Sequence, residues 1–94
     1  MSNDKEYNKM MGKYHQKWDE TAKLIMKGKT IIDVGYISKE EAEDYMWNVR
    51  GVWFQLDDGT RLICMRDDEG NDAGVSAYLN EGVDSVLPVI GMED

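Results

Sequence analysis

The sequence has very few of the residues that covalent or metal-based stabilisation requires. Cys64 is the only cysteine and His15 the only histidine among 94 residues. A disulfide within one chain is therefore excluded, and no cysteine–histidine spacing typical of a zinc site is present. A lone cysteine also suits a reducing compartment better than a secreted setting. We therefore expect a cytoplasmic protein with no metal site and no cofactor.

Long apolar runs are also missing. The polar start, Met1-Ser2-Asn3-Asp4-Lys5-Glu6, precedes no apolar segment of signal-peptide length. No apolar stretch approaches the roughly 20 residues that span a bilayer, so we expect no membrane partner. Ninety-four residues suffice for one domain. Because so small a domain has a thin margin of stability, self-association is a common support, and a homodimer is its default form.

The net charge of −8 is unevenly distributed along the chain. Residues 1–30 contain seven lysines against four acidic residues (+3), whereas residues 31–94 contain four cations against fifteen acidic residues (−11). The single domain thus comprises a basic segment, residues 1–28, and an acidic body, residues 29–94. Because like charges repel, direct binding of nucleic acid to the body is disfavoured and binding to a basic protein surface is favoured.

Apolar and aromatic residues recur near the N-terminus at helical spacing, which predicts a helix from about Asp4 to Lys27 that ends at Gly28. Two arrangements of this stripe stay open: it packs on the sheet of the same chain, or it pairs with the same helix of a second subunit. The stripe consists of Tyr7, Met11, Tyr14, Trp18, Thr21 and Ile25. In the second arrangement Tyr7, Met11, Tyr14, Trp18 and Ile25 form the oligomer interface.

Alternating patterns predict strands at residues 30–37, 51–56, 61–66 and 75–79. Ser38 and Glu41 have the spacing of a capping box, which begins a short helix that runs to about Trp47. The dipeptide Asp58-Gly59 indicates a two-residue type I′ hairpin. Pro88 confines the apolar residues 83–90 to an edge strand or an extended tail. A long helix, a strand, a short helix and then an antiparallel β-meander make an α+β fold.

Residues that could form a catalytic site are scarce. His15 lies on a helix among lysines, and no serine has the context of a nucleophile elbow. A glycine-rich phosphate loop is also absent. Cys64, in the middle of a strand, is expected to be a small buried apolar residue. We therefore expect a protein that binds and is not an enzyme.

The segment Asp67-Asp68-Glu69-Gly70-Asn71-Asp72-Ala73-Gly74, here called the acidic loop, is the most unusual part of the sequence. It does not match an EF-hand, because neither register places glycine at position 6 of the calcium loop, so a divalent ion would bind here only at an irregular site. Aspartate, asparagine and glycine also serve ordinary turn geometry. The alternative is a recognition loop that presents its acidic groups to a partner or small ligand. Both interpretations stay open, and Asp67, Asp68, Glu69, Asn71 and Asp72 are its candidate binding residues.

Two arginines lie beside the acidic loop and the short helix. Arg50 and Arg66 form ordinary ion pairs in the simplest interpretation. If both point into one cleft beside Asn71 and either Trp47 or Trp53, they form a site for a nucleotide-like ligand. The sequence alone does not choose between these interpretations.

From about residue 30 onward the sequence resembles small acidic proteins of phages and bacteria. The residues that carry the likeness are Val34–Glu41, Trp47, Arg50, Leu56-Asp57-Asp58-Gly59-Thr60 and Asp67–Gly74. Among these proteins it resembles the anti-restriction proteins of the Arn type found in T4-like phages. The resemblance implies a homodimeric DNA mimic that occupies the DNA-binding surface of a host restriction enzyme. The seven-lysine segment departs from a uniformly acidic mimic.

Three functions compete. The first is a phage-type inhibitor that presents acidic surface to a basic host defence protein. Its candidate residues, besides the acidic loop, are Glu40, Glu41, Asp57 and Asp58. The second is a binder of a small nucleotide-like signal used in host defence, through Arg50 and Arg66. The third is an oligomeric structural or assembly protein that associates through the first helix.

Overall fold

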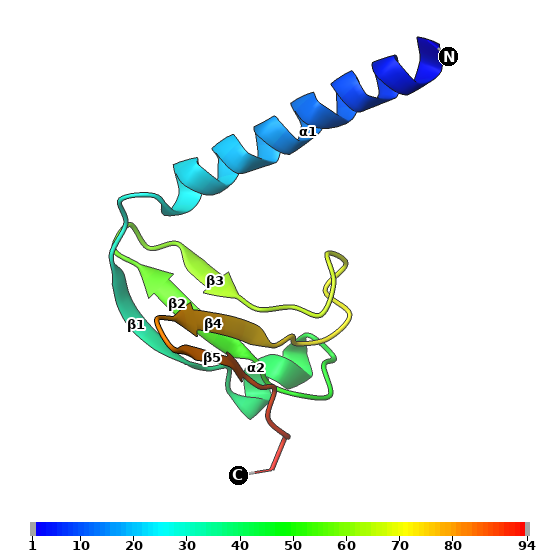
Figure 1. Ribbon diagram of the computed structural model, residues 1–94. Helices are drawn as coiled ribbons and strands as arrows, with labels where there is room; N and C mark the ends of the chain where they lie inside the picture. Colours follow the sequence, from blue (N-terminus) through cyan, green and yellow to red (C-terminus); the bar gives the residue numbers. More distant parts are fainter. Residues whose placement is uncertain (1, 94) are drawn as a thin grey trace.

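A computed structural model describes the backbone of residues 2–93 and the side chains from residue 12 onward, that of residue 84 excepted. The elements are, in chain order, α1 (Ser2–Met26), β1 (Ile31–Tyr36), α2 (Lys39–Asp44), β2 (Val52–Leu56), β3 (Arg61–Ile63), β4 (Ser76–Asn80) and β5 (Val83–Leu87). Helices and antiparallel strands in separate parts of the chain confirm the α+β class (Figure 1). In the described part of the chain, no helix is long and apolar enough to cross a bilayer.

The long helix α1 stands away from the rest of the molecule, joined to β1 by a short connection (Figure 1). Tyr14 and Trp18, in the middle of its aromatic stripe, are 54% and 52% exposed. The expectation that the stripe packs on the sheet of its own chain is therefore wrong for these two residues. Two other stripe positions, Tyr7 and Met11, have side chains outside the described part of the structure.

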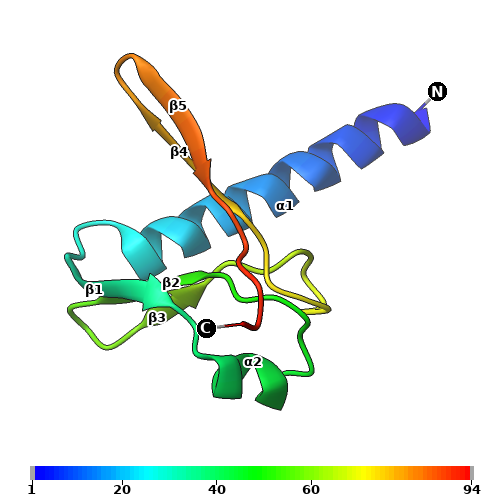
Figure 2. The same cartoon turned by 90° about the horizontal axis from the view of Figure 1, so that it is seen from below.

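The strands form two separate antiparallel units. The first is a three-stranded sheet in the order β1-β2-β3. Strand β4 does not continue this meander but pairs with β5, so that the two form a two-stranded ribbon. Figure 2 shows the ribbon projecting from the body. Pro88 directly follows β5, consistent with the expected edge position of residues 83–90.

Strand β3 ends at Ile63, three residues earlier than the sequence pattern predicts. Beyond it, the chain is held by an isolated bridge between Met65 and Ala73 and by a 2.9 Å hydrogen bond from the Gly74 N–H to the Cys64 carbonyl. Since these bonds close the two ends of the acidic loop onto each other, the chain leaves the sheet here instead of adding a fourth strand.

A small core lies between α2, the sheet and the acidic loop. Its buried members are Ile37, Ala42, Trp47 and Ala73, and half-buried Val49, Trp53, Ile63, Val89 and Met92 pack against them. Cys64 is only half-buried, so its expected full burial is wrong.

The turn between β2 and β3 differs from the expected type I′ hairpin. Gly59 has a φ of 92°, but Asp58 does not have the positive φ that a type I′ turn requires at its first central residue. The Gly59 N–H donates to the Leu56 carbonyl at 3.0 Å, which closes a turn centred on Asp57 and Asp58. A glycine with positive φ after such a turn is typical of a three-residue hairpin loop with a β-bulge.

Helix α2 begins as the capping box predicts. The Ser38 hydroxyl accepts a 3.0 Å hydrogen bond from the Glu41 N–H, and Ser38 itself has extended backbone geometry. The helix ends at Asp44, earlier than the predicted Trp47, because Met46 has a φ of 61° and cannot continue it.

Removal of this cap gives a first testable prediction. We expect Ser38→Ala to lower the free energy of unfolding by about 1 kcal/mol, because the Glu41 N–H loses its partner. Urea unfolding followed by tryptophan fluorescence measures the change. Ser38→Asp, which keeps an acceptor at the same position, is the matched control and should retain most of the stability. An equal loss in both variants would show that the hydroxyl contributes something other than the cap.

Candidate functional site

The acidic loop is an ordered turn, held by its own side chains. The Asp67 carboxylate accepts hydrogen bonds from the N–H groups of Glu69 and Asn71 at 3.1 and 3.2 Å, and from the Asn71 side-chain amide at 2.9 Å. The Asn71 side-chain and backbone N–H groups, with smaller help from Glu69 and Arg66, hold the pKa of Asp67 below its ordinary value despite some desolvation. Asp67 therefore serves the geometry of the turn.

The loop is also fixed to the core by Trp47. The indole N–H of this buried residue donates to the Gly70 carbonyl at 2.7 Å. Gly70 has a φ of 71°, a left-handed conformation that glycine adopts without a steric penalty.

Asp72 is a buried structural carboxylate, and not an exposed binding residue as expected from the sequence. Its side chain accepts hydrogen bonds from the N–H groups of Asn48, Val49 and Ala73 at 3.2, 3.3 and 2.8 Å. The residue is 7% exposed. Burial acts to raise the pKa of Asp72, but these three backbone N–H groups outweigh burial and hold the pKa below its ordinary value. Asp72 thus joins the acidic loop to the segment that follows α2.

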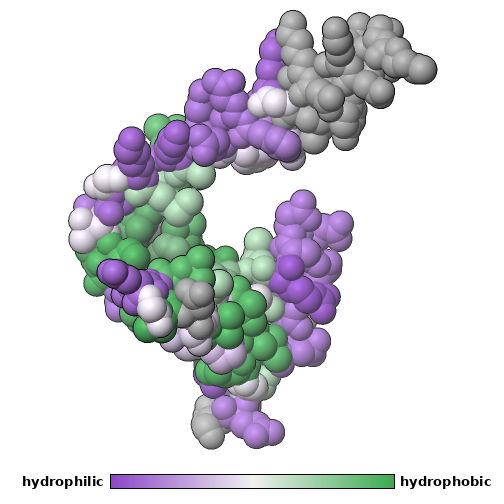
Figure 3. All heavy atoms as spheres, viewed as in Figure 1, coloured by the Kyte–Doolittle hydropathy of each residue, from purple (hydrophilic) through white to green (hydrophobic). Residues whose placement is uncertain are grey.

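The tip of the acidic loop remains available to a partner. Asp68, Glu69 and Asn71 are exposed. Figure 3 shows hydrophilic residues over this part of the surface and apolar residues over the sheet beside it. Of the five candidate residues in the loop, these three can contact another molecule without loss of an internal bond to the core.

The two arginines do not form the predicted anion site. The Arg50 guanidinium donates to the carbonyls of Gly91 and Glu93 at 2.9 and 3.2 Å, and its backbone pairs with Ile90. It therefore holds the C-terminal segment. Arg66 is exposed, and its Nε lies 4.0 Å from the Asp67 carboxylate, at the limit of an ion pair. The convergence of both arginines on one cleft, which a nucleotide-like ligand would need, is not present among the described residues.

Glu40 and Glu41, adjacent in the first turn of α2, have different surroundings. Glu41 pairs with Arg61 at 2.8 Å and accepts a 3.2 Å hydrogen bond from the Tyr45 hydroxyl. Glu41 raises the pKa of Tyr45 through its charge and this bond. The Arg61 guanidinium also lies 4.7 Å from the centre of the Trp53 ring. Glu41 therefore fixes α2 to the sheet, while Glu40 is exposed.

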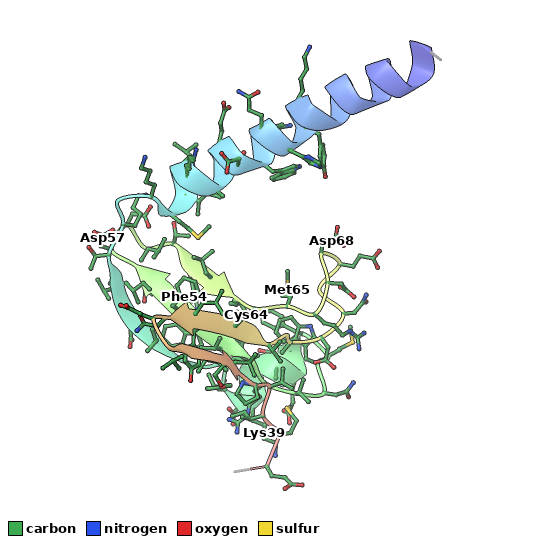
Figure 4. The ribbon with its side chains drawn as sticks, in the orientation of Figure 1. Lys39, Phe54, Asp57, Cys64, Met65 and Asp68 are labelled. Atoms are coloured by element: carbon green, nitrogen blue, oxygen red, sulfur yellow. The ribbon has the colours of Figure 1, made fainter. Side chains whose placement is uncertain are left out.

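Asp57 and Asp58 differ in the same way. Asp58 pairs with Lys29 and accepts a 2.9 Å hydrogen bond from the Thr60 N–H. The Lys29 ammonium and this N–H lower the pKa of Asp58 to about 2. Asp57 is exposed. Figure 4 shows Asp57 and Asp68 at opposite sides of the body, so their two acidic turns do not form one patch.

A hollow of about 330 Å³ beside the acidic loop was not anticipated from the sequence. It is lined by Tyr45, Trp47, Ile63, Met65 and Gly70. Tyr45 and Met65 are 44% and 47% exposed. Figure 4 shows Met65 directed to the same side of the body as the acidic loop. No sequence signal pointed to this hollow, because its lining comes from three segments that meet only in the fold.

Among the described side chains, no three histidine, cysteine or carboxylate groups are arranged to hold a metal ion. Comparison with protein-family models, with curated proteins and with solved structures gives no match to this chain.

Proposed function

We propose that the protein is a small inhibitor that acts by binding, and that it presents exposed carboxylates to the basic, nucleic-acid-binding surface of a partner protein. In the setting that the sequence resemblance implies, the partner is a host defence protein of the bacterial cytoplasm and the inhibitor imitates DNA.

One observation carries this proposal: nine exposed acidic residues of the body have no ion-pair partner among the described residues. They are Asp33, Glu40, Glu43, Asp44, Asp57, Asp68, Glu69, Glu81 and Glu93. Meanwhile, the guanidinium groups of Arg50 and Arg61 are bound to other parts of the body. The body therefore has a surplus of solvated negative charge, which attracts a basic surface and is strongly screened by salt.

A pull-down from bacterial lysate tests the proposal. The bait is the protein itself, and the test variant is Asp68→Asn/Glu69→Gln, which removes two exposed charges without touching Asp67 or Asp72. We expect capture of a nucleic-acid-binding protein that duplex DNA displaces. Its affinity should fall by about tenfold or more between 50 and 200 mM salt, and should fall again in the variant.

The matched control is Asp19→Asn/Glu20→Gln, which removes the same charge from exposed positions on α1. This control should bind as the unaltered protein does. A captured protein that DNA does not displace, or binding that is indifferent to salt and to both double variants, would contradict the proposal.

A further inference from the structure

The chain exposes more surface than a folded monomer of its size. Its accessible area is 7498 Å², whereas about 5500 Å² is typical of a folded monomer of 10.8 kDa. Its radius of gyration is 17.1 Å, against about 12 Å for a compact domain of 94 residues. The surplus of about 2000 Å² exceeds the roughly 800 Å² that each partner contributes to a standard interface. The surplus area is therefore large enough to form an interface with a second protein.

The first uncovered surface is the stripe of α1. Tyr14, Trp18 and Ile25 lie at i, i+4 and i+11, and are 54%, 52% and 38% exposed. An isolated helix gains most of its stability in water from packing of its apolar face. This stripe therefore needs a partner that its own body does not supply.

The second uncovered surface is an apolar groove between the three-stranded sheet and the ribbon β4–β5. It has a volume of about 360 Å³, and its lining includes Ile31, Val34, Tyr36, Val52, Phe54 and Leu87. On the ribbon face that Leu87 shares, Tyr78 and Val83 are 43% and 50% exposed. A two-stranded ribbon is marginally stable at best in water unless one face is covered. The groove and the ribbon thus form one continuous apolar face.

Charge favours one pairing of these surfaces. Helix α1 contains five lysines and four acidic residues, a charge of +1, so its pairing with α1 of a second copy gains no net charge attraction. The groove belongs instead to residues 31–94, which carry a charge of −11, and exposed Glu81 lies in the turn of the ribbon. Packing of α1 on the groove of a second copy combines apolar contact with opposite charges.

We propose that the protein forms a two-fold dimer in which α1 of each copy lies on the groove and ribbon of the other. A two-fold interface is self-complementary, so one contact of helix with groove generates the second. The arrangement covers the stripe, the groove and the ribbon together. It does not rest on the proposed inhibitory function, because Asp57, Asp68 and Glu69 lie outside this interface.

Light scattering coupled to size-exclusion chromatography tests the dimer with the full chain at high micromolar concentration. The unaltered protein should have twice the 10.8 kDa mass of one chain. Trp18→Asp removes the helix contact and Val34→Lys the groove contact, so each variant alone should be monomeric. Val34 is 59% exposed, so the body should fold in both variants, as circular dichroism would verify. Met46→Lys, at an 86% exposed position elsewhere, is the control and should remain dimeric.

Mixing of the two variants distinguishes a dimer in which each helix lies on the groove of the other copy from other kinds of dimer. The Trp18→Asp copy retains its groove and the Val34→Lys copy retains its helix, so an equimolar mixture should recover a heterodimer with one intact contact. A folded Val34→Lys variant that stays dimeric would overturn the proposal in favour of helix–helix pairing. A monomeric unaltered protein at this concentration, or a mixture that remains monomeric, would overturn it as well.

Discussion

Replacement of Asp72 by alanine is expected to destabilise the body by about 2–4 kcal/mol. The change leaves the N–H groups of Asn48, Val49 and Ala73 without the carboxylate that they share. An unpaired buried donor costs about 1–3 kcal/mol, and Ala73 is buried at 4% exposure. Equilibrium urea unfolding measures the loss. Asp72→Asn keeps an acceptor oxygen without the charge and should cost about 1 kcal/mol.

The same residue makes stability depend on pH. Since the pKa of Asp72 is lower in the folded protein than its ordinary value of 3.8, the stability that it contributes is present above that value. This contribution is lost as the pH falls through the folded pKa. Asp67 and Asp58 act in the same direction, and the pKa of Asp58 is about 2.

We therefore expect the unaltered protein to lose stability from about pH 4 down to about pH 2, and Asp72→Ala to lose less over the same range. If the free energy of unfolding fell equally with pH in the two proteins, the Asp72 carboxylate would not be held by these N–H groups. Equal unfolding free energies at pH 7 would show the same by an independent measurement.

Gly74→Ala is expected to cost about 3 kcal/mol or more, a large part of the roughly 5–15 kcal/mol that holds a typical domain folded. A Cβ at this buried position would lie 2.5 Å from the carbonyl carbon and oxygen of Met65 and 2.9 Å from the Arg66 nitrogen. These are backbone atoms, which cannot rotate away as a side chain would. Relief of the clash also breaks the 2.9 Å hydrogen bond from Gly74 to Cys64, which closes the acidic loop.

Gly12→Ala is the matched control for this prediction. Nothing lies within 4 Å of a Cβ at Gly12, which is in the interior of α1. The change should stabilise the helix by about 1 kcal/mol and leave unfolding of the body unchanged. Circular dichroism reports the helix, and tryptophan near-ultraviolet signals report the packed body. A Gly74→Ala variant with native signals and native stability would contradict the close approach of the two backbone segments.

Features with a local cause were predicted well. The spacing of apolar residues within residues 4–27 identified α1, because the residues on one face of a helix recur about every 3.6 positions in the sequence. The Ser38 cap was located from the spacing to Glu41, since both partners lie within one turn. The hairpin between β2 and β3 was also located, but its turn type was wrong. Asp58 accepts from Thr60 and pairs with Lys29, and a dipeptide preference does not include these contacts.

Features that depend on contacts between distant segments were not predictable. Asp68, Glu69 and Asp72 look alike in the sequence, yet only Asp72 is buried. Its burial arises because the fold brings residues 48 and 49 beside the loop. Arg50 seemed available for an anion, but the C-terminal carbonyls of Gly91 and Glu93 occupy its guanidinium. The apolar hollow beside Met65 likewise has no sequence signature.

The sequence by itself determined the α+β class, the positions of most elements, and the division between a basic helix and an acidic body. These follow from residue order and charge, which do not depend on how the elements pack. Only the tertiary structure decided which carboxylates are structural and which are free, that β4 and β5 leave the sheet, and that α1 stands away from its own body. Each of these is settled by which segments meet in space. An acidic side chain can accept hydrogen bonds either from backbone N–H groups of distant segments or from water. Its role is therefore determined by its neighbours in the fold and not by its neighbours in the sequence.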